Sequence, residues 1–366
     1  MRSRVAVKGL QSVLNARRVA VQGYSLVELM IAISLGLIVV AAAMAVLLSA
    51  QRLVSLQNAM DELQQNANLA VGMLSFDLRQ SNLNMPSQQL INNKTQGSGI
   101  IFGAANLPAS MASQASAYQA LWTQQESGVA ATEQKSDQLL IQYLPEYELG
   151  GSVLESDANR SATSATQVYR AGFDCEGEKI EFTQQRSDDP QSSTAQASAQ
   201  PIIVNRYYLK KDPQQIKGEA PGYSLFCQSG YYVAGDQHIT GLTANGGQQI
   251  MKRVDAFKVR LGVKAPDGKL RYLTINQYLA LMPNHVTQPQ SYYNIISIEL
   301  GLLLRSSTAV TADTAANTAQ AAAQQEFELL GTPLKLQQDP LSKKYLRQNM
   351  TQVVALRNAL GVHDGR

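Results

Sequence analysis

A single glutamate, Glu28, stands at the entrance of a long apolar stretch. It follows Gly23 by five residues, and the next charged residue is Arg52. A carboxylate costs about 2.5–3.5 kcal/mol at the centre of a membrane span, and less near the interface. Such a group is a functional candidate that needs a cationic partner. The alternative is that Glu28 merely lies in the headgroup zone.

Catalytic motifs are missing from the sequence. It holds no G-x-S-x-G, P-loop, H-E-x-x-H or C-x-x-C pattern. Four acidic residues could invite calcium, but they do not approach a D-x-D-x-D-G loop and are more simply solvated loop acids: Asp174, Glu176, Asp188 and Asp189. The histidines lie far apart, at His238, His285 and His363. We therefore expect no enzyme, no metal and no cofactor.

The charge of the chain is unevenly distributed. The 366 residues include 31 basic and 28 acidic ones, and only 16% are charged, below the roughly 25% that is usual in soluble proteins. No basic face is implied, which argues against a nucleic-acid binder. Met1 to Gly23 hold five basic residues and no acidic one, which leaves 26 basic and 28 acidic residues in the rest.

The apolar stretch predicts one membrane span at about residues 29–51. About 20 apolar residues in a helix cover the roughly 30 Å of bilayer hydrocarbon. The basic segment before it stays in the cytoplasm, so that the chain after it is exported. A buried core helix is the first alternative, but few stay apolar all round for six turns. A cleaved secretory signal is the second, but its apolar region is only about 7–15 residues long.

The helix is predicted to continue beyond the membrane and to stop near Asn82–Asn84. Apolar residues recur at alternating spacings of three and four, which gives a narrow stripe: Leu53, Leu56, Met60, Leu63, Ala67, Ala70 and Leu74. Only Gly72 weakens this run, by about 1 kcal/mol relative to alanine. The stripe either docks on the protein's own head or meets other helices.

After Pro86 the sequence predicts a β-rich head, residues 86–366. Short runs of β-branched and aromatic residues indicate strands at Ile100–Phe102, Gln138–Leu144, Lys179–Phe182, Ile202–Leu209, Tyr223–Cys227, Val254–Val263, Leu270–Leu279, Asn294–Leu304 and Gln352–Leu356. Asp267-Gly268 is a hairpin signal between two of them. Three Ala-, Gln-, Ser- and Thr-rich tracts are predicted to be loops: 109–135, 183–200 and 306–325. A short Ala-rich helix is the alternative for the last of them. We expect an α+β fold, an antiparallel sheet with long loops packed on the long N-terminal helix.

Cys175 and Cys227 are the only cysteines. If the head is exported, its compartment is oxidising and favours a disulfide between them. Closing a loop of about 50 residues contributes roughly 4 kcal/mol in the chain-entropy model. Two unpaired buried thiols are the alternative.

The segment Gly23-Tyr24-Ser25-Leu26-Val27-Glu28-Leu29-Met30, with its basic leader and apolar run, resembles the cleavage and methylation region of type IV prepilins. The resemblance implies that a membrane-embedded peptidase cuts after Gly23 and then methylates the amino terminus of Tyr24. Glu28 would attract that cationic amine, on its own chain or on a neighbouring subunit. Tyr24 departs from the family's usual phenylalanine.

Short parts of the head resemble the PilW family of minor pilins. They are Gly172-Phe173-Asp174-Cys175, Val204-Asn205-Arg206-Tyr207-Tyr208, Ser224-Leu225-Phe226-Cys227, Tyr345-Leu346-Arg347-Gln348 and Val354-Ala355-Leu356-Arg357-Asn358. This resemblance implies a subunit that joins other minor pilins to prime or cap a type IV pilus. It would support pilus biogenesis, twitching motility, adhesion or DNA uptake.

These expectations divide the chain into a leader (1–23), a long helix (24–85) and an exported head (86–366). The implied partners are prepilin peptidase, other minor pilins, the major pilin, the inner-membrane assembly platform and membrane lipid. The protein would sit in the inner membrane with its N-terminus in the cytoplasm and its head in the periplasm, and after assembly in the pilus, at its tip. A minor pseudopilin of type II secretion, nearest to the J component, is the alternative, and a membrane-anchored adhesin that never assembles is a third.

Overall fold

The computed structural model describes residues 23–87, 89–153, 166–185, 200–309, 326–337 and 345–359, with Asp339 and Leu341. The chain divides after Val54 into two units. The helices are α1 (Leu26–Gln80) and α2 (Ile275–Leu281), and the 3-10 segments are η1 (Ala104–Asn106), η2 (Ala109–Leu121), η4 (Pro289–Ser291) and η7 (Arg357–Ala359). The strands are β1 (Gln138–Tyr143), β2 (Glu148–Val153), β3 (Thr166–Phe173), β4 (Lys179–Gln185), β5 (Ile202–Lys211), β6 (Tyr223–Tyr232), β7 (Gln248–Lys252), β8 (Val254–Lys264), β9 (Leu270–Thr274), β10 (Asn294–Ala309), β11 (Glu326–Leu329), β12 (Thr332–Lys335) and β13 (Tyr345–Ala355).

Helix α1 forms because its sequence is rich in Ala, Leu, Met and Gln and contains no proline. It ends in a turn where Asn82 takes a φ of 67°, a left-handed conformation that asparagine tolerates at helix ends. The side chain of Asn82 donates a hydrogen bond of 2.8 Å to the carbonyl oxygen of Asn358. In return Asn358 Nδ2 donates to the carbonyl oxygen of Ser81 at 3.1 Å. The last turn of the helix is thus satisfied by a residue near the other end of the chain.

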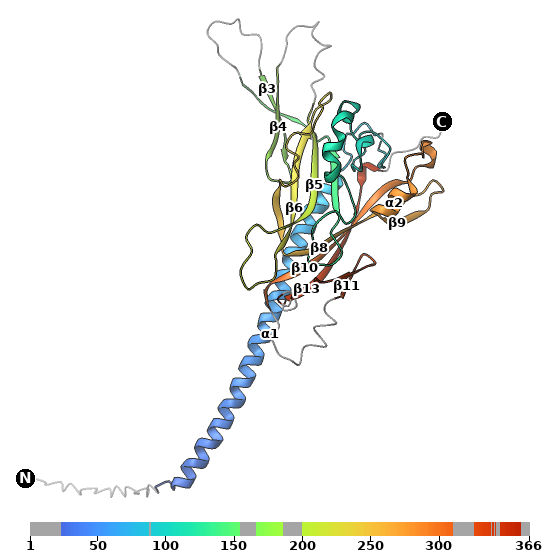
Figure 1. Ribbon diagram of the computed structural model, residues 1–366. Coiled ribbons are helices and arrows are strands. Elements are labelled where there is room, and N and C mark those ends of the chain that lie inside the picture. The colour runs from blue at the N-terminus through green and yellow to red at the C-terminus, as the bar shows by residue number, and fades with distance from the viewer. Residues whose placement is uncertain are drawn as a thin grey trace, which may run out of the picture. The chain divides into compact units, whose positions relative to one another are not determined.

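From Ala59 onward α1 packs against the sheets of its own unit (Figure 1). Its buried apolar side chains are Ala59, Leu63, Ala67, Ala70, Val71, Leu74 and Leu78. Each buried leucine contributes about 2 kcal/mol of apolar burial. Of the two alternatives for the predicted stripe, docking on the chain's own head therefore holds from Leu63 to Leu74, whereas Leu53 and Met60 remain exposed.

Two four-stranded sheets contribute much of the core, and every strand pair among the described residues is antiparallel. Their strand orders are β1-β5-β6-β7 and β13-β10-β8-β9, and smaller sheets are formed by β2-β3-β4 and β11-β12. The largest core cluster joins α1 to Tyr207 and Leu225 of the first sheet and to Phe257 and Leu302 of the second. The predicted α+β arrangement, a long N-terminal helix with antiparallel sheets, is therefore confirmed.

The predicted hairpin at Asp267-Gly268 is present, but the strand after it is shorter than expected. Strands β8 and β9 pair from Lys264↔Leu270 onward, and Gly268 takes a φ of 82° in the turn. Leu270–Leu279 was predicted to be one strand, which is wrong from Ile275 onward, where α2 begins. Thr274 and Gln277 form a reciprocal capping box that starts this helix.

Two further segments differ from the prediction. The tract 109–135 was predicted to be a weakly ordered loop, but it contains η2 and buries Met111, Tyr118 and Leu121 in a second core cluster. Ile100–Phe102 is not a strand and contributes only an isolated bridge to Ile141. In the other two tracts, Thr183–Gln185 belongs to β4 and Ser306–Ala309 to β10, whereas 186–199 and 310–325 lie outside the described residues.

Candidate functional site

The start of α1 is organised around Ser25. The backbone N–H of Glu28 donates a hydrogen bond of 3.1 Å to Ser25 Oγ, and that of Leu29 donates to the Ser25 carbonyl oxygen at 3.1 Å. Ser25 thus caps the helix and satisfies N–H groups that would otherwise lack a partner. Glu28 lies in the first turn, where the helix dipole favours a negative charge. The local sequence therefore fixes the carboxylate one turn beyond Tyr24.

Gly23 and Tyr24 precede the helix and are exposed. The Tyr24 side chain is 84% exposed, and a Cβ added at Gly23 would meet no atom within 4 Å. Nothing in the described fold therefore requires a glycine or an aromatic residue here. Residues 1–22, most of the predicted leader, lie outside the described residues.

The first half of α1 has an apolar surface that no other described residue of its unit covers. Among the described residues, this is the one helix long and apolar enough to cross a membrane, and its most apolar window has no buried residue. Ser34 lies within it and donates its hydroxyl to the carbonyl oxygen of Ile31 at 2.9 Å, so this polar group is satisfied internally. Gly36 likewise has open space at its Cβ position. Such a surface needs lipid or other subunits around it.

Glu28 has no ionic partner or side-chain hydrogen bond within the described part of the chain. Between Leu29 and Leu48 the only polar side chain is that of Ser34, whose hydroxyl is already bound. Among the described residues that precede Arg52, Glu28 therefore carries the only charged side chain.

In the second unit a disulfide joins Cys175 to Cys227, with their Cα atoms 6.0 Å apart. Cys227 is a buried residue of β6, and Cys175 lies in the turn between β3 and β4. The bridge ties the small β2-β3-β4 sheet to the first large sheet beside α1.

The acidic residues near this bridge are occupied by backbone groups. Asp174 Oδ1 accepts hydrogen bonds from the N–H groups of Glu176 and Glu178, both at 2.9 Å. Glu176 Oε2 accepts one from Ser229 at 2.9 Å, while burial raises the pKa of Glu176. Among the described residues no group of three His, Cys, Asp or Glu side chains could hold a metal ion. Asp188 and Asp189 lie outside the described residues.

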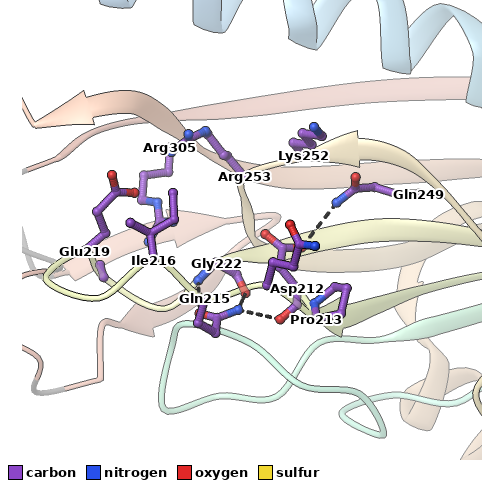
Figure 2. Close-up of a pocket in the computed structure, with 12 residues that line it drawn as sticks. Asp212, Pro213, Gln215, Ile216, Glu219, Gly222, Gln249, Lys252, Arg253 and Arg305 are labelled. Carbon is purple, nitrogen blue, oxygen red and sulfur yellow. Dashed lines mark hydrogen bonds between the residues drawn. The ribbon is translucent and has the colours of Figure 1, made fainter.

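A pocket of about 240 Å³ lies under the loop between β5 and β6 (Figure 2). Gln215 Nε2 donates to the Asp212 carbonyl oxygen at 2.6 Å, and its Oε1 accepts from the N–H of Gly222 at 2.8 Å. Gln249 Nε2 reaches Asp212 Oδ1 at 3.2 Å from β7. None of the described residues lining the pocket is a serine, threonine, cysteine or histidine. Its polar groups hold the loop in place rather than forming a nucleophile with a base.

Two features of the second unit escaped the sequence analysis. The first is a second apolar row on α1, formed by Leu69, Met73 and Phe76, which are all exposed. Its spacing of four and three residues could have revealed it. The second is a hydrogen bond between Asp77 and Tyr207, which are 130 residues apart in the chain and carry no common sequence signal.

Two family models match the chain. The prokaryotic N-terminal methylation motif matches residues 18–44, which include Gly23, Tyr24 and Glu28. The type IV pilus-assembly protein W family, PilW, matches residues 206–358, from β5 to η7. Comparison with curated proteins found no match, and neither did comparison with solved structures.

The two matches cover complementary parts of the same architecture. The methylation motif spans the junction and the first turns of the apolar helix, which fit a membrane-anchored pilin. The PilW match spans most of both large sheets. PilW proteins are structural pilins, which interact with other pilins and with the assembly machinery. The family matches and the fold thus support the assignment of this chain as a type IV minor pilin of the PilW family.

Proposed function

We propose that the protein is made as a prepilin, cleaved after Gly23 and methylated at the amino group of Tyr24. The observation that carries this proposal is the isolated carboxylate of Glu28, one turn beyond an exposed Gly23-Tyr24 junction and at the start of an uncovered apolar helix. Cleavage creates a cationic amine where the sequence previously had a peptide bond. That amine is the partner that Glu28 lacks.

The division of the chain follows from this processing. Residues 1–23 are the leader, residues 24–85 the long helix and residues 86–366 the head. The helix enters the inner membrane at about residues 29–51, with its N-terminus in the cytoplasm and its head in the periplasm. The basic leader favours this orientation.

Assembly then transfers the helix from lipid into the core of a filament. The head joins other minor pilins in a complex that primes or caps the type IV pilus, on the inner-membrane platform that adds the major pilin. Where water is scarce, the attraction between Glu28 and a Tyr24 amine is strong, so it sets the register of each subunit against its neighbour. Gly36 permits close approach of helices within the apolar region.

Mass spectrometry of the protein purified from membranes tests the processing. The expected chain begins at Tyr24 and carries one added methyl group, and a chain that begins elsewhere would contradict the cleavage site. A Gly23→Val variant should remain uncleaved, because its side chain obstructs the peptidase at the cut. A Gly36→Ala variant, which alters another open glycine, is the matched control and should be processed normally.

Assembly is tested separately. Glu28→Ala should be cleaved normally but lost from pili, and Glu28→Asp should restore part of the incorporation because it restores the charge. Equal incorporation of wild type and Glu28→Ala would exclude the pairing. A deletion strain scored for pili, twitching and DNA uptake, beside secretion of a type II substrate, identifies the machine. Failure of secretion alone would assign the chain to the pseudopilin alternative.

A further inference from the structure

Helix α1 carries a second apolar face in the unit that begins at Ser55. Leu69, Met73 and Phe76 are exposed by 68%, 48% and 66%, and their spacing places them on one side of the helix. The neighbouring Ala70 and Leu74 point instead into the core. Three neighbouring large apolar side chains that are exposed to solvent are unusual on a helix whose opposite face already packs in the core. Such an exposed apolar patch is typical of an interaction surface.

Gly72 lies within this face and has no role in the packing of its own chain. A Cβ added there would meet no atom within 4 Å. Gly99 shows the opposite situation, because its Cβ would lie 2.4 Å from the backbone nitrogen of Asn82. A glycine in the middle of a helix weakens that helix. Gly72 instead leaves a notch in the surface between Leu69, Met73 and Phe76, through which another backbone can approach.

A cavity of about 760 Å³ adjoins the notch. Besides the apolar face of α1, it is lined by Ile250 of the edge strand β7 and by the turn that holds Cys175. Its volume is sufficient for several large side chains of a partner. Three carboxylates line it, those of Asp77, Asp174 and Glu176, whereas none of the described lining residues is a lysine or arginine.

We propose that the surface formed by Leu69, Gly72, Met73 and Phe76, together with this cavity, is the docking site for a helix of another pilin subunit. The proposal rests on the function proposed above and names the partner's chemistry. The partner helix crosses α1 at Gly72, because a small residue lets two helices approach closely. It inserts apolar side chains into the cavity and places a Lys or Arg near the three carboxylates, which complement a positive charge. The same carboxylates oppose an anionic lipid headgroup.

The first experiment places a photoreactive phenylalanine analogue at Met73 in the full-length chain, expressed in cells that assemble pili. Irradiation should produce one major adduct, whose cross-linked peptide is a helical segment of another pilin subunit with a Lys or Arg within two turns. The same analogue at Tyr272, an exposed residue of β9, is the control and should give no such adduct. An adduct with a second copy of this chain, with lipid, with a protein that is not a pilin, or no adduct at all would overturn the proposal.

The second experiment separates docking from folding. Gly72→Ala should raise the melting temperature, because alanine favours the helix, and yet reduce the Met73 adduct; Gly72→Leu should reduce the adduct at least tenfold. A purely structural role for Gly72 predicts the higher melting temperature with an unchanged adduct, and that result would overturn the proposal. Leu69→Ser should also reduce the adduct, whereas Leu270→Ser, at an equally exposed leucine on β9, should not.

Failure of this proposal differs from failure of the proposed function. If Glu28→Ala blocks incorporation into pili but Gly72→Leu and Leu69→Ser do not, the protein is an assembled pilin and the docking site is wrong. If a deletion strain and Glu28→Ala both assemble normal pili, the function itself is wrong, whatever adduct Met73 forms.

Glu176→Gln, which keeps the acceptor for Ser229 but removes a charge, should weaken the adduct most at low salt. An effect of Glu176→Gln that does not depend on salt would contradict the electrostatic part of the docking.

Discussion

The hydroxyl of Tyr207, on β5, donates a hydrogen bond of 2.8 Å to Asp77 Oδ2, on α1. Tyr207 is fully buried and Asp77 is partly so, which means that this bond fastens the helix to the first sheet from inside the core. Burial raises the pKa of Asp77, while the bond from Tyr207 lowers it and nearby Asp174 raises it further. The net shift is upward from the usual value of 3.8.

The raised pKa of Asp77 predicts that the contribution of this residue to the free energy of unfolding falls as the pH rises. At pH values between the unfolded and the folded pKa of Asp77, the native state binds more protons than the unfolded state. The contribution of Asp77 to stability is therefore most favourable below the usual pKa, and it is lost as the pH rises through the folded pKa. Asp77→Asn removes the charge and keeps an acceptor for Tyr207. Its melting temperature relative to wild type should therefore increase from about pH 3.8 upward and then level off.

Thermal melts of the full chain in detergent, recorded across this range, measure that difference. Asp61→Asn, at an exposed position of the same helix, is the control and should track wild type at every pH. A difference between Asp77→Asn and wild type that is the same at every pH would contradict the linkage.

Removing the disulfide should destabilise the head. The bridge spans 52 residues of sequence, and loss of such a bridge typically costs about 2–4 kcal/mol. The double variant Cys175→Ser/Cys227→Ser should therefore unfold at lower denaturant concentration than wild type. Wild type treated with a reductant should then unfold together with the variant, and a reductant that leaves the wild-type midpoint unchanged would count against a stabilising bridge.

The buried charges around Asp255 should be far more sensitive than those on the surface. Arg347 Nε lies 2.7 Å from Asp255 Oδ2, and Arg305 Nε lies 3.8 Å from Oδ1, with all three side chains almost fully buried. Arg347→Ala leaves the Asp255 charge buried with less compensation, which costs about 3–5 kcal/mol. Arg170→Ala breaks an exposed pair with Glu181 and should cost at most about 1 kcal/mol. Denaturant unfolding of both variants compares them, and equal losses would contradict this assignment.

Truncation should destabilise the protein strongly on one face of α1 and hardly at all on the other. Leu74 is almost fully buried, so Leu74→Ala should reduce the free energy of unfolding by about 2–5 kcal/mol. Leu69 is exposed, and Leu69→Ala should change it by less than about 0.5 kcal/mol. Urea titration of the two variants measures both values, and a large loss at Leu69 would mean that this face packs within the monomer.

The parts of the fold that sequence could reveal are those set by local pattern. The stripe containing Leu63 and Leu74 predicted the helix, and the Asp267-Gly268 signal predicted the β8–β9 hairpin. Strand β7 was missed because Gln248–Lys252 has little β-branched character and is held in place by β6. Strand β12, which pairs with β11, was missed because its Pro333 argues locally against a strand.

The tract 109–135 was misjudged for a related reason. Its composition is dominated by small and polar residues, but Met111 and Tyr118 reach a cluster with strands that lie far away in sequence. The Tyr118 hydroxyl also accepts a hydrogen bond of 2.8 Å from the N–H of Ile239. Average composition could not show which few side chains would be buried.

The candidate site shows the same contrast. Gly23, Tyr24 and Glu28 lie within six residues, so their chemistry was readable without a structure. The docking surface was only half readable: the spacing of Leu69, Met73 and Phe76 was visible in the sequence, but the cavity beside Gly72 is formed by β7 and the disulfide turn, which come from distant parts of the chain.

The hydrogen bonds that join Asn358 to Asn82 and Ser81 make the end of α1 depend on a residue made much later in synthesis. The ribosome makes Asn82 first, and its partner Asn358 is made 276 residues later. Until Asn358 has been made, the Asn82 side chain and the Ser81 carbonyl oxygen at the end of α1 lack their native hydrogen-bond partner. A chain interrupted anywhere before Asn358 would therefore lack these partners at the end of α1.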